Sequence, residues 1–473
     1  MAHSLHRRAF LQHASLGAAL ATALRAKEAG SATHFPDRAK RVVVLHQSGA
    51  PSQIDLFDPK PQLLLQQGKE LPEEIRKNQR LTTMTSDQKQ KSLVGSPFPF
   101  KRHGESGLEL SSLLPHLATA ADHLCVIRSM HTEAINHDPA ITFMYTGSQI
   151  PGRPSLGAWC SYGWMRETAN APDFVAMVSG GRPGDQPLSS RLWGAGFLPQ
   201  RHAAMRMRSG ADPLLFLSNP PGIDRQVRLR QLDAIEGLDA IAGTSASGTS
   251  DDGGQADVAL HSRWQAYRQT LELQQLMPEA ADLKQEPEET WRLYGEEARR
   301  PGTFAANCVR ARRLLERDVP FVQLFHRGWD HHEEIVARLP IQCRETDQAS
   351  AALVLDLHRR GMLDDTLVVW AGEFGRTAYC QGAIDGGAYG RDHHPRCFSI
   401  WLAGAGVKTG VYGETDEFSY NITDKPVHVH DLQATLLHLL GFDHRRLTFR
   451  TQGRDYRLTD QFGEVVGGLL GDA

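Results

Sequence analysis

Short apolar runs, rich in β-branched residues, recur along the chain and stop at clusters of polar residues. They span Arg41 to His46, Leu124 to Met130, Val319 to Phe325 and Thr366 to Trp370. Runs of this kind are typical of strands that are buried on both faces of a parallel sheet. An amphipathic segment at 344–361 separates the last two runs. This order predicts a strand–helix–strand unit whose two strands run parallel.

Helical patterns complete the fold prediction. Apolar residues spaced three and four apart predict a helix at 113–123. Pro139 suits the first turn of a second helix that ends at Gly147, and a third helix is expected over 431–440. We therefore expect an α/β protein, with three α/β/α layers around a mainly parallel central sheet.

The first 32 residues are set apart from this domain. Arg7-Arg8 and Phe10-Leu11 precede a short alanine-rich run, a pattern that resembles a bacterial twin-arginine export signal. The alternative is an amphipathic N-terminal helix. The run is too short for a stable membrane anchor. We expect a signal peptide at 1–32, a domain at 40–473 with an insertion or cap at about 165–300, and a periplasmic or otherwise extracytoplasmic location. After removal of the signal, no integral membrane segment is expected.

Composition narrows the possible classes of partner and of site. The 52 basic and 55 acidic residues give a net charge of −3, so no electrostatic argument favours nucleic acid or an anionic membrane as a partner. The six cysteines form no C-x-x-C pair, which disfavours a zinc ribbon and leaves disulfides open. The 22 histidines include several beside acids, and this enrichment directs attention to a metal site.

Three polar clusters follow or flank the strands of the second half. They are Gly328-Trp329-Asp330-His331-His332, Gly372-Glu373-Phe374-Gly375-Arg376, and the glycine-rich loop that carries Asp392-His393. In an extended chain Asp330 and His332 point to the same side, and parallel strands bring Glu373 to the same sheet edge. We predict a metal site of Asp330, His332, Glu373 and His393. Its oxygen and nitrogen ligands suit Zn, Mn or Fe.

Other interpretations of these residues stay open. Asp330 also suits a helix N-cap with surface histidines beside it. Asp55 and Asp58 follow the first strand and are interpreted as turn and cap residues rather than ligands. His428 and His430 are interpreted as structural. Arg376 suits either the binding of a substrate oxyanion or the bracing of a carboxylate.

Four motifs occur in the order found in the alkaline phosphatase/sulfatase superfamily, which the chain resembles over roughly residues 40–160 and 300–470. They are Leu114 to Ala121, His137-Asp138-Pro139 with Thr146-Gly147, Gly372 to Gly375, and Asp431 to Gly441. More narrowly, the chain resembles an uncharacterised bacterial branch of this superfamily, a domain-of-unknown-function family that often carries twin-arginine signals. The resemblance implies an alkaline-phosphatase-like fold, divalent metal and an ester substrate.

The departures from the sulfatase pattern bear on the chemistry. His137 stands where the family has its Cys, Ser or Thr nucleophile, Ile141 where a sulfatase has arginine, and Phe374 where it has histidine. Ser48-Gly49 stand near the position of the aspartates on the first strand. A formylglycine sulfatase mechanism is therefore not supported, and a full two-zinc phosphatase site is in doubt.

The function predicted is an exported metal-dependent hydrolase of phosphate or sulfate esters, acting on a small-molecule or polysaccharide ester. The expected cofactor is a divalent ion, with Zn, Mn and Ca as candidates. His137 is predicted to be the general base or the covalent nucleophile, and Arg376 to stabilise developing negative charge. The alternative is a catalytically inactive binding protein that keeps the fold. Oxidoreductase or transferase chemistry has no cofactor motif in its favour.

Overall fold

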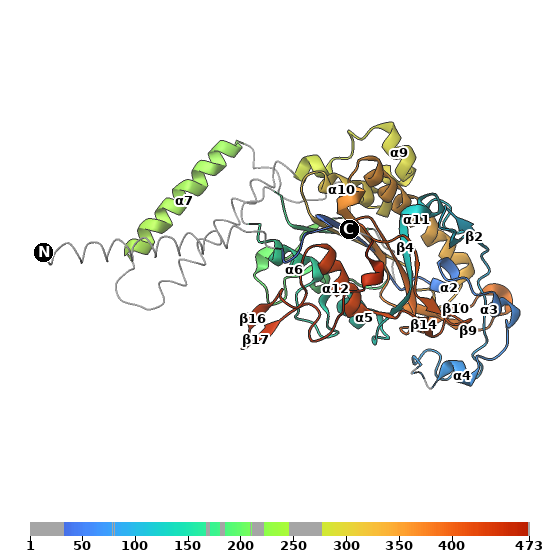
Figure 1. Ribbon diagram of the computed structural model, residues 1–473. Coiled ribbons are helices and arrows are strands. Elements are labelled where there is room, and N and C mark those ends of the chain that lie inside the picture. Colours follow the sequence, from blue (N-terminus) through green and yellow to red (C-terminus); the bar gives the residue numbers. More distant parts are fainter. Residues whose placement is uncertain are drawn as a thin grey trace.

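The computed structural model describes residues 33–77, 79, 81–166, 171–179, 185–208, 210, 222–245 and 277–471 (Figure 1). The predicted signal peptide at 1–32 lies outside these ranges. Three further segments also lie outside them: residues 214–217, whose apolar pattern suggests a strand, residues 180–184, whose glycines indicate a turn, and most of 244–255, whose small polar residues are typical of a linker.

A central sheet of nine strands organises the domain, in the order β12-β4-β11-β8-β1-β7-β5-β6, with β15 pairing β4. Its strands are β1 Arg41–Ser48, β4 Leu124–His131, β5 Phe174–Val178, β6 Met205–Met207, β7 Phe321–Arg327, β8 Thr366–Ala371, β11 Phe398–Ala403, β12 Gly410–Tyr412 and β15 Val427–His428. Strand β11 alone runs antiparallel to its neighbours β4 and β8. All other pairings in this sheet are parallel.

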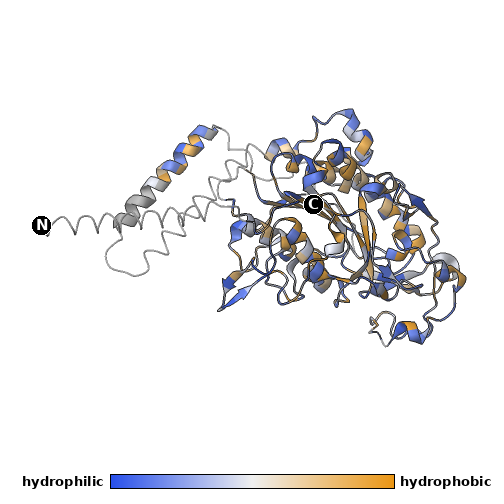
Figure 2. Cartoon of the chain, viewed as in Figure 1, coloured by the Kyte–Doolittle hydropathy of each residue, from blue (hydrophilic) through white to orange (hydrophobic). Residues whose placement is uncertain are grey.

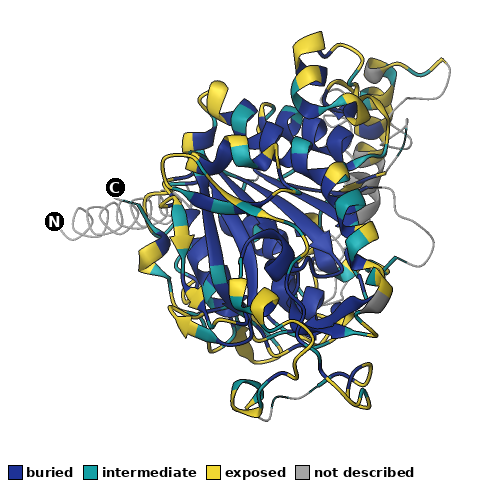
Figure 3. Cartoon of the chain, turned by 90° about the vertical axis from the view of Figure 1, so that its right-hand side faces the viewer, coloured by how far each residue is buried: buried dark blue, intermediate teal, exposed yellow. Residues whose placement is uncertain are grey.

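Two helical layers cover the sheet. One apolar core packs three helices against one face: α10 (Phe304–Leu315), α11 (Ile335–Arg359) and the 3-10 helix η1 (Leu117–His123). Another core packs α5 (His137–Thr146), α6 (Leu156–Trp164) and α12 (Val429–Leu439) against the other face (Figure 1). Alternate residues of β1 divide between the cores, since Val43 belongs to the first and Val44 to the second. The central strands of the sheet are largely hydrophobic in Figure 2 and buried in Figure 3. The predicted α/β/α architecture is confirmed.

The remaining elements surround these layers. The helices are α2 Gln53–Leu56, α3 Pro61–Leu65, α4 Glu73–Arg76, α5 His137–Thr146, α6 Leu156–Trp164, α7 Arg225–Ser245, α9 Glu288–Tyr294, α10 Phe304–Leu315, α11 Ile335–Arg359 and α12 Val429–Leu439. Four two-stranded pairs are β2 Phe100–His103 with β3 Leu108–Ser111, β9 Gly375–Gln381 with β10 Gly390–His394, β13 Glu414–Thr415 with β14 Ile422–Asp424, and β16 Phe449–Thr451 with β17 Arg454–Tyr456. Among the described helices, none combines the length and apolarity needed to cross a membrane.

Three central strands, β7, β1 and β8, end at the same edge. The unit β7–α11–β8 is the predicted strand–helix–strand unit, and β1 lies between its two strands, parallel to both. Because parallel strands share an edge, the residues that follow β1, β7 and β8 meet there. The hairpin β9–β10 begins four residues after the end of β8 and returns Asp392 and His393 to this edge.

Several elements differ from the sequence predictions. The helix expected at 113–123 is the shorter 3-10 helix η1, Leu117–His123. It starts later than expected, at Leu117, because the Asp347 carboxylate accepts hydrogen bonds from the backbone N–H groups of His116 and Leu117. Helix α11 begins nine residues earlier than expected and contains Pro340, a residue that is unfavourable inside a helix. The expected glycine-rich loop contains strand β10.

Part of the range expected to form a cap belongs to the sheet. Strands β5 and β6 lie within 165–300 and extend the sheet beyond β7. Both are short, and β6 has only three residues, so their sequence signal is weak. Helices α7 and α9 also lie within this range, and α7 stands apart from the layers in Figure 1.

Candidate metal centre

Four side chains converge at the edge where β1, β7 and β8 end. His137, Asp330, His332 and His393 each offer one ligand atom, and these four atoms all lie within 4.8 Å of one another. His137 is the first residue of α5, and Asp330 and His332 lie in the loop after β7. His393 lies on β10. Three elements far apart in the sequence therefore build one cluster.

The Oδ1 atom of Asp330 lies at the centre of this cluster. It is 2.8 Å from Nε2 of His332, 3.1 Å from Nε2 of His137 and 3.6 Å from Nε2 of His393. The side chains of Asp330 and His332 are about one-fifth exposed, whereas those of His137 and His393 are nearly fully buried. Solvent therefore reaches the cluster from the side of Asp330 and His332.

Each histidine is held by its other ring nitrogen. Nδ1 of His137 lies 2.6 Å from Oε1 of Glu373, and Nδ1 of His332 lies 2.6 Å from the amide oxygen of Gln381. Nδ1 of His393 lies 2.8 Å from the carbonyl oxygen of Ile135. All three partners are acceptors, so each Nδ1 carries the proton and each Nε2 presents a lone pair to the cluster. Acceptors placed at Nδ1 in this way fix the orientation of imidazoles that bind a metal ion through Nε2.

The convergence of these lone pairs requires a cation. Nε2 of His332 and Nε2 of His393 face each other at 3.1 Å, and neither carries a proton when its ring is neutral. Two lone pairs beside a carboxylate oxygen repel unless a proton or a metal ion lies between them. Three imidazoles and one carboxylate are a ligand set suited to Zn²⁺, Mn²⁺ or Fe²⁺ and less suited to Ca²⁺, which prefers oxygen ligands.

The titration behaviour of the cluster agrees with this charge requirement. Burial raises the pKa of the Asp330 carboxyl, but the neighbouring imidazoles of His137, His332 and His393 outweigh it and hold the pKa far below its usual range. Burial lowers the pKa of His137, yet the neighbouring carboxylates of Asp330 and Glu373 raise it overall. Without a metal ion, a proton on His137 is therefore favoured.

Glu373 differs from its predicted place among the ligands. It is fully buried behind His137, where its Oε1 accepts hydrogen bonds from His137 and from the backbone N–H of Gly49, at 2.9 Å. Its Oε2 lies 3.5 Å from Nε2 of His46, which is also fully buried. Burial lowers the pKa of His46 to about 4, so this ring is neutral at pH 7. The position expected of Glu373 in the cluster is taken by His137.

Arg376 braces the cluster. Its Nη2 donates to Oδ1 of Asp330 at 2.6 Å, its Nε to the carbonyl of Ala50 at 2.9 Å, and its Nη1 to the carbonyl of Arg391 at 3.0 Å. The side chain is 1% exposed, so the guanidinium is occupied by the protein. Of the two roles weighed for Arg376, the geometry matches the bracing of a carboxylate.

Gly49 and Gln186 also belong to the site, and the sequence predicted a role in the site for neither of them. Gly49 has a φ of +110°, and a Cβ added there would lie 2.5 Å from the backbone nitrogen of Asp330. Only glycine permits this approach between the ends of β1 and β7. Gln186 donates to Oδ2 of Asp330 at 2.9 Å from within the range expected to form a cap. The available sequence signal for Gly49 was its place directly after a buried strand. No sequence signal marked Gln186.

The other candidate residues are structural. Asp55 accepts hydrogen bonds from Arg391 and Ser52, and Asp58 accepts from Thr415 and Ser419. His428 caps α12, and Nδ1 of His430 lies 3.1 Å from Oε1 of Gln433. His331 lies outside the cluster. All six cysteines of the chain lie within the described ranges, and each is a buried free thiol.

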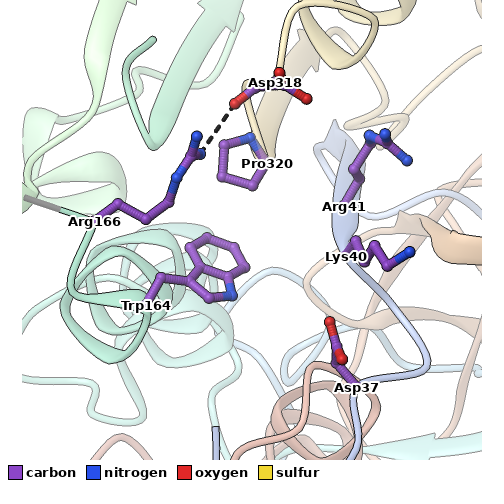
Figure 4. A pocket seen from close by; sticks show the side chains of 7 residues that line it. All are labelled: Asp37, Lys40, Arg41, Trp164, Arg166, Asp318 and Pro320. Carbon is purple, nitrogen blue, oxygen red and sulfur yellow. Dashed lines mark hydrogen bonds between the residues drawn. The ribbon is translucent and has the colours of Figure 1, made fainter. Parts of the chain in front are cut away.

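A cavity of about 250 Å³ lies at the opposite end of the sheet (Figure 4). Its lining includes Arg41, which begins β1, and Pro320, which precedes β7, so it faces the edge far from the cluster. Lys40 and Arg41 pair with Asp365, and Arg166 pairs with Asp173. The convergent ligands, not this cavity, mark the candidate functional site.

Solved structures similar to this chain include several enzymes. The lipoteichoic acid synthase LtaP from Listeria monocytogenes is 8% identical over 91% of this chain and 78% of its own, with a TM-score of 0.36. A protein of the alkaline phosphatase superfamily from Vibrio parahaemolyticus is 12% identical over 90% and 71%, with a TM-score of 0.35. The sulfatase PsFucS1 from Pseudoalteromonas sp. is 10% identical over 89% and 70%, with a TM-score of 0.32.

Comparison of the sequence with known proteins places the chain in a family without an assigned activity. No curated protein matches it significantly. The model of the family described as "Protein of unknown function (DUF1501)" matches residues 39–470, which is nearly the whole domain. The predicted membership of a domain-of-unknown-function family is therefore confirmed, and this chain belongs to the DUF1501 family.

Proposed function

We propose that this protein is an exported, metal-dependent hydrolase of phosphate or sulfate esters whose metal ligands are His137, Asp330, His332 and His393. One observation carries the proposal: three Nε2 atoms with oriented lone pairs meet one carboxylate oxygen. The substrate proposed is a small-molecule or polysaccharide ester. Export by the twin-arginine route rests on Arg7-Arg8 and the alanine-rich run that follows.

In this proposal, some residues hold the metal ion and others orient the residues that hold it. Glu373 keeps the Nδ1 proton of His137 in place, and Arg376 keeps Asp330 ionised and oriented. A divalent ion held by these ligands would supply Lewis acidity for the hydrolysis of an ester. Asp330 and Glu373 carry two negative charges against one positive charge on Arg376, so a divalent ion leaves the site with a net positive charge. A net positive charge favours an anionic substrate.

His137 is reassigned by this proposal. It was predicted to be the base or the nucleophile, but both of its nitrogens are engaged, Nδ1 with Glu373 and Nε2 with the cluster. A ligand nitrogen cannot also accept a proton or attack an ester. The attacking group in this proposal is therefore water.

A binding protein is the second candidate, and the engagement of His137 and Arg376 favours it. Neither side chain is free to act as a base, a nucleophile or an oxyanion donor. Such a protein would bind metal and an anionic ligand without turnover.

The test combines metal analysis with a panel of aryl phosphates and aryl sulfates. The wild-type protein is expected to contain about one divalent ion per chain and to hydrolyse at least one ester class. Asp330→Asn should lose both the metal and the hydrolysis, while His358→Ala, which changes an exposed histidine, should change neither. Metal binding without turnover would favour the binding protein, and hydrolysis that survives Asp330→Asn would contradict the proposed site.

A further inference from the structure

A positively charged side chain beside the metal would strengthen the binding of an anionic ester, and the arginines at the site edge are mostly occupied. Arg376 donates to Asp330 and to backbone carbonyls, and it is almost fully buried. Arg391 is buried in a pair with Asp55. Arg191 pairs with Asp138 and also donates to Thr142. None of these three guanidinium groups is free to bind a ligand.

Arg327 is the exception at this edge. It is the last residue of β7, it is half-buried, and its Nε atom is buried without a hydrogen-bond partner. Within the described ranges, no carboxylate forms an ion pair with it. A buried N–H of a charged group that lacks a partner costs free energy unless a ligand or water satisfies it. This position therefore carries an unused charged donor.

The strand register places Arg327 next to the cluster. Its partner on β1 is Ser48, which precedes Gly49, and Gly49 contacts both Glu373 and the loop of Asp330. Arg327 itself lies three residues before Asp330. The hydroxyl of Ser48 is buried and also lacks a hydrogen-bond partner.

The direction of the side chain follows from the alternation along β7. Phe325 packs against Tyr145 of α5 and against His46 of β1, so its side chain lies on the face that α5 covers. Arg327 is two residues further on and lies on the same face. Helix α5 begins at the site with His137, so this face is also the one that supplies a metal ligand.

We propose that Arg327, with the hydroxyl of Ser48, binds the non-bridging oxygens of the phosphate or sulfate group beside the metal. This inference rests on the proposed function and assigns the recognition of the anion within it. A guanidinium matches the geometry of tetrahedral oxyanions, which it binds through paired N–H donors. Arg327 is accordingly a residue that selects anionic over neutral esters.

The experiment measures the binding of inorganic phosphate and of inorganic sulfate to the metal-loaded full chain by calorimetry. Arg327→Gln is expected to weaken the binding of the preferred anion by about ten- to 100-fold, the effect of losing hydrogen bonds to a charged group. Arg327→Lys should recover part of the affinity. Metal content should stay unchanged in both variants. Arg206→Gln, which alters an exposed arginine lying over Trp193, is the matched control and should bind like wild type.

The outcomes separate this inference from the proposed function. Equal anion affinity in wild type and Arg327→Gln overturns the role of Arg327 but leaves a metal-loaded, active enzyme intact. Equal losses in Arg327→Gln and Arg206→Gln also overturn it, because the effect would then be one of general charge. A wild-type protein that holds metal but binds neither anion overturns the inference as well. Absence of metal in wild type instead contradicts the proposed function.

Discussion

The site contains four side chains that converge at one point and three acceptor groups that orient the imidazoles among them. His137, Asp330, His332 and His393 meet, while Glu373, Gln381 and the carbonyl of Ile135 each hold one imidazole by its Nδ1 atom. A carboxylate acceptor makes an imidazole more basic than a carbonyl or an amide does. His137 is therefore expected to be the strongest nitrogen ligand.

The contribution of Glu373 can be measured without removing a ligand. Glu373→Gln keeps the size of the side chain but removes its charge, so His137 becomes less basic and less firmly oriented. We expect metal affinity to fall by about ten- to 100-fold, as is typical for such partners. Competition with a chelator of known affinity measures the change. Glu414→Gln, at an exposed position, serves as the control. Unchanged affinity in Glu373→Gln would show that Glu373 does not support the site.

Gly49 permits a second test at a single residue. Gly49 and Gly152 have nearly the same φ, +110° and +113°, but only Gly49 is crowded, since an added Cβ would meet the backbone of Trp329 and Asp330. Both Gly→Ala variants carry a similar backbone strain, on the order of 1–3 kcal/mol. Gly49→Ala should lose more stability and should also lose metal affinity, because it displaces the Asp330 loop. Thermal unfolding and metal titration of the two variants give the comparison; equal effects would rule out this crowding.

At the scale of the elements, the site depends on a few connections between segments that are distant in sequence. The hairpin β9–β10 carries His393, and the hydroxyls of Thr82 and Thr85 donate to the neighbouring Asp392. A second connection lies between α11 and η1, where Asp347 accepts the first N–H groups of η1. Each connection joins two elements through a buried carboxylate.

Asp347 gives the connection between α11 and η1 a pH dependence. Burial raises the pKa of this carboxyl from 3.8 to about 6, although the backbone N–H groups of His116 and Leu117 oppose the shift. The folded state therefore keeps a proton that the unfolded state releases between pH 4 and pH 6, and stability falls as pH rises through that window.

The variant Asp347→Asn removes this titration. The free energy of unfolding of wild type, measured against that of Asp347→Asn, should fall by up to about 1.4 kcal/mol per pH unit from pH 4 to pH 6 and then level off. Denaturant unfolding at several pH values measures the difference. A difference that stays constant, or rises, across this window would contradict the assignment.

The elements also show how far the sequence allowed prediction. Strands β1, β7 and β8 were predictable because long apolar runs have few alternatives, and the pair Asp330 and His332 followed from the two-residue period of an extended chain. The role of Glu373 was not predictable in this way. Whether Glu373 or His137 faces the cluster depends on how closely α5 approaches the end of β8, which no local pattern records.

Some hydrogen-bond partners of the cluster residues could not be predicted from the sequence, because they come from the backbone or from segments without a clear pattern. The carbonyl of Ile135 carries no side-chain signal, and Gln381 and Gln186 are common surface residue types. Helix α11 was predicted too short, and it contains Pro340, a residue that is unfavourable inside a helix.

At the scale of the whole molecule, one sheet carries the candidate site at one edge and an unrelated cavity at the other (Figure 4). Two apolar cores hold the helices against the sheet, so the edge is a rigid platform for ligands from α5, the β7 loop and β10. The six cysteines are buried thiols, so the fold does not depend on disulfide bonds among them.

The location of the molecule is a separate prediction. If Arg7 and Arg8 form a twin-arginine signal, replacing both by lysine should leave the protein inside the cell, because that export route recognises the arginine pair. Fractionation of cells that express the wild type or the double variant measures the location. The same variant should leave the metal content of the purified protein unchanged, and export that persists in it would contradict the twin-arginine assignment.

The central claim is that His137, Asp330, His332 and His393 hold one divalent ion. The most direct measurement is the elemental analysis of purified wild-type protein beside His393→Ala and the exposed-histidine control His358→Ala. We expect about one divalent transition-metal ion per chain in wild type and in His358→Ala, and little in His393→Ala. Wild-type protein without a stoichiometric metal, or equal metal in His393→Ala, would contradict it.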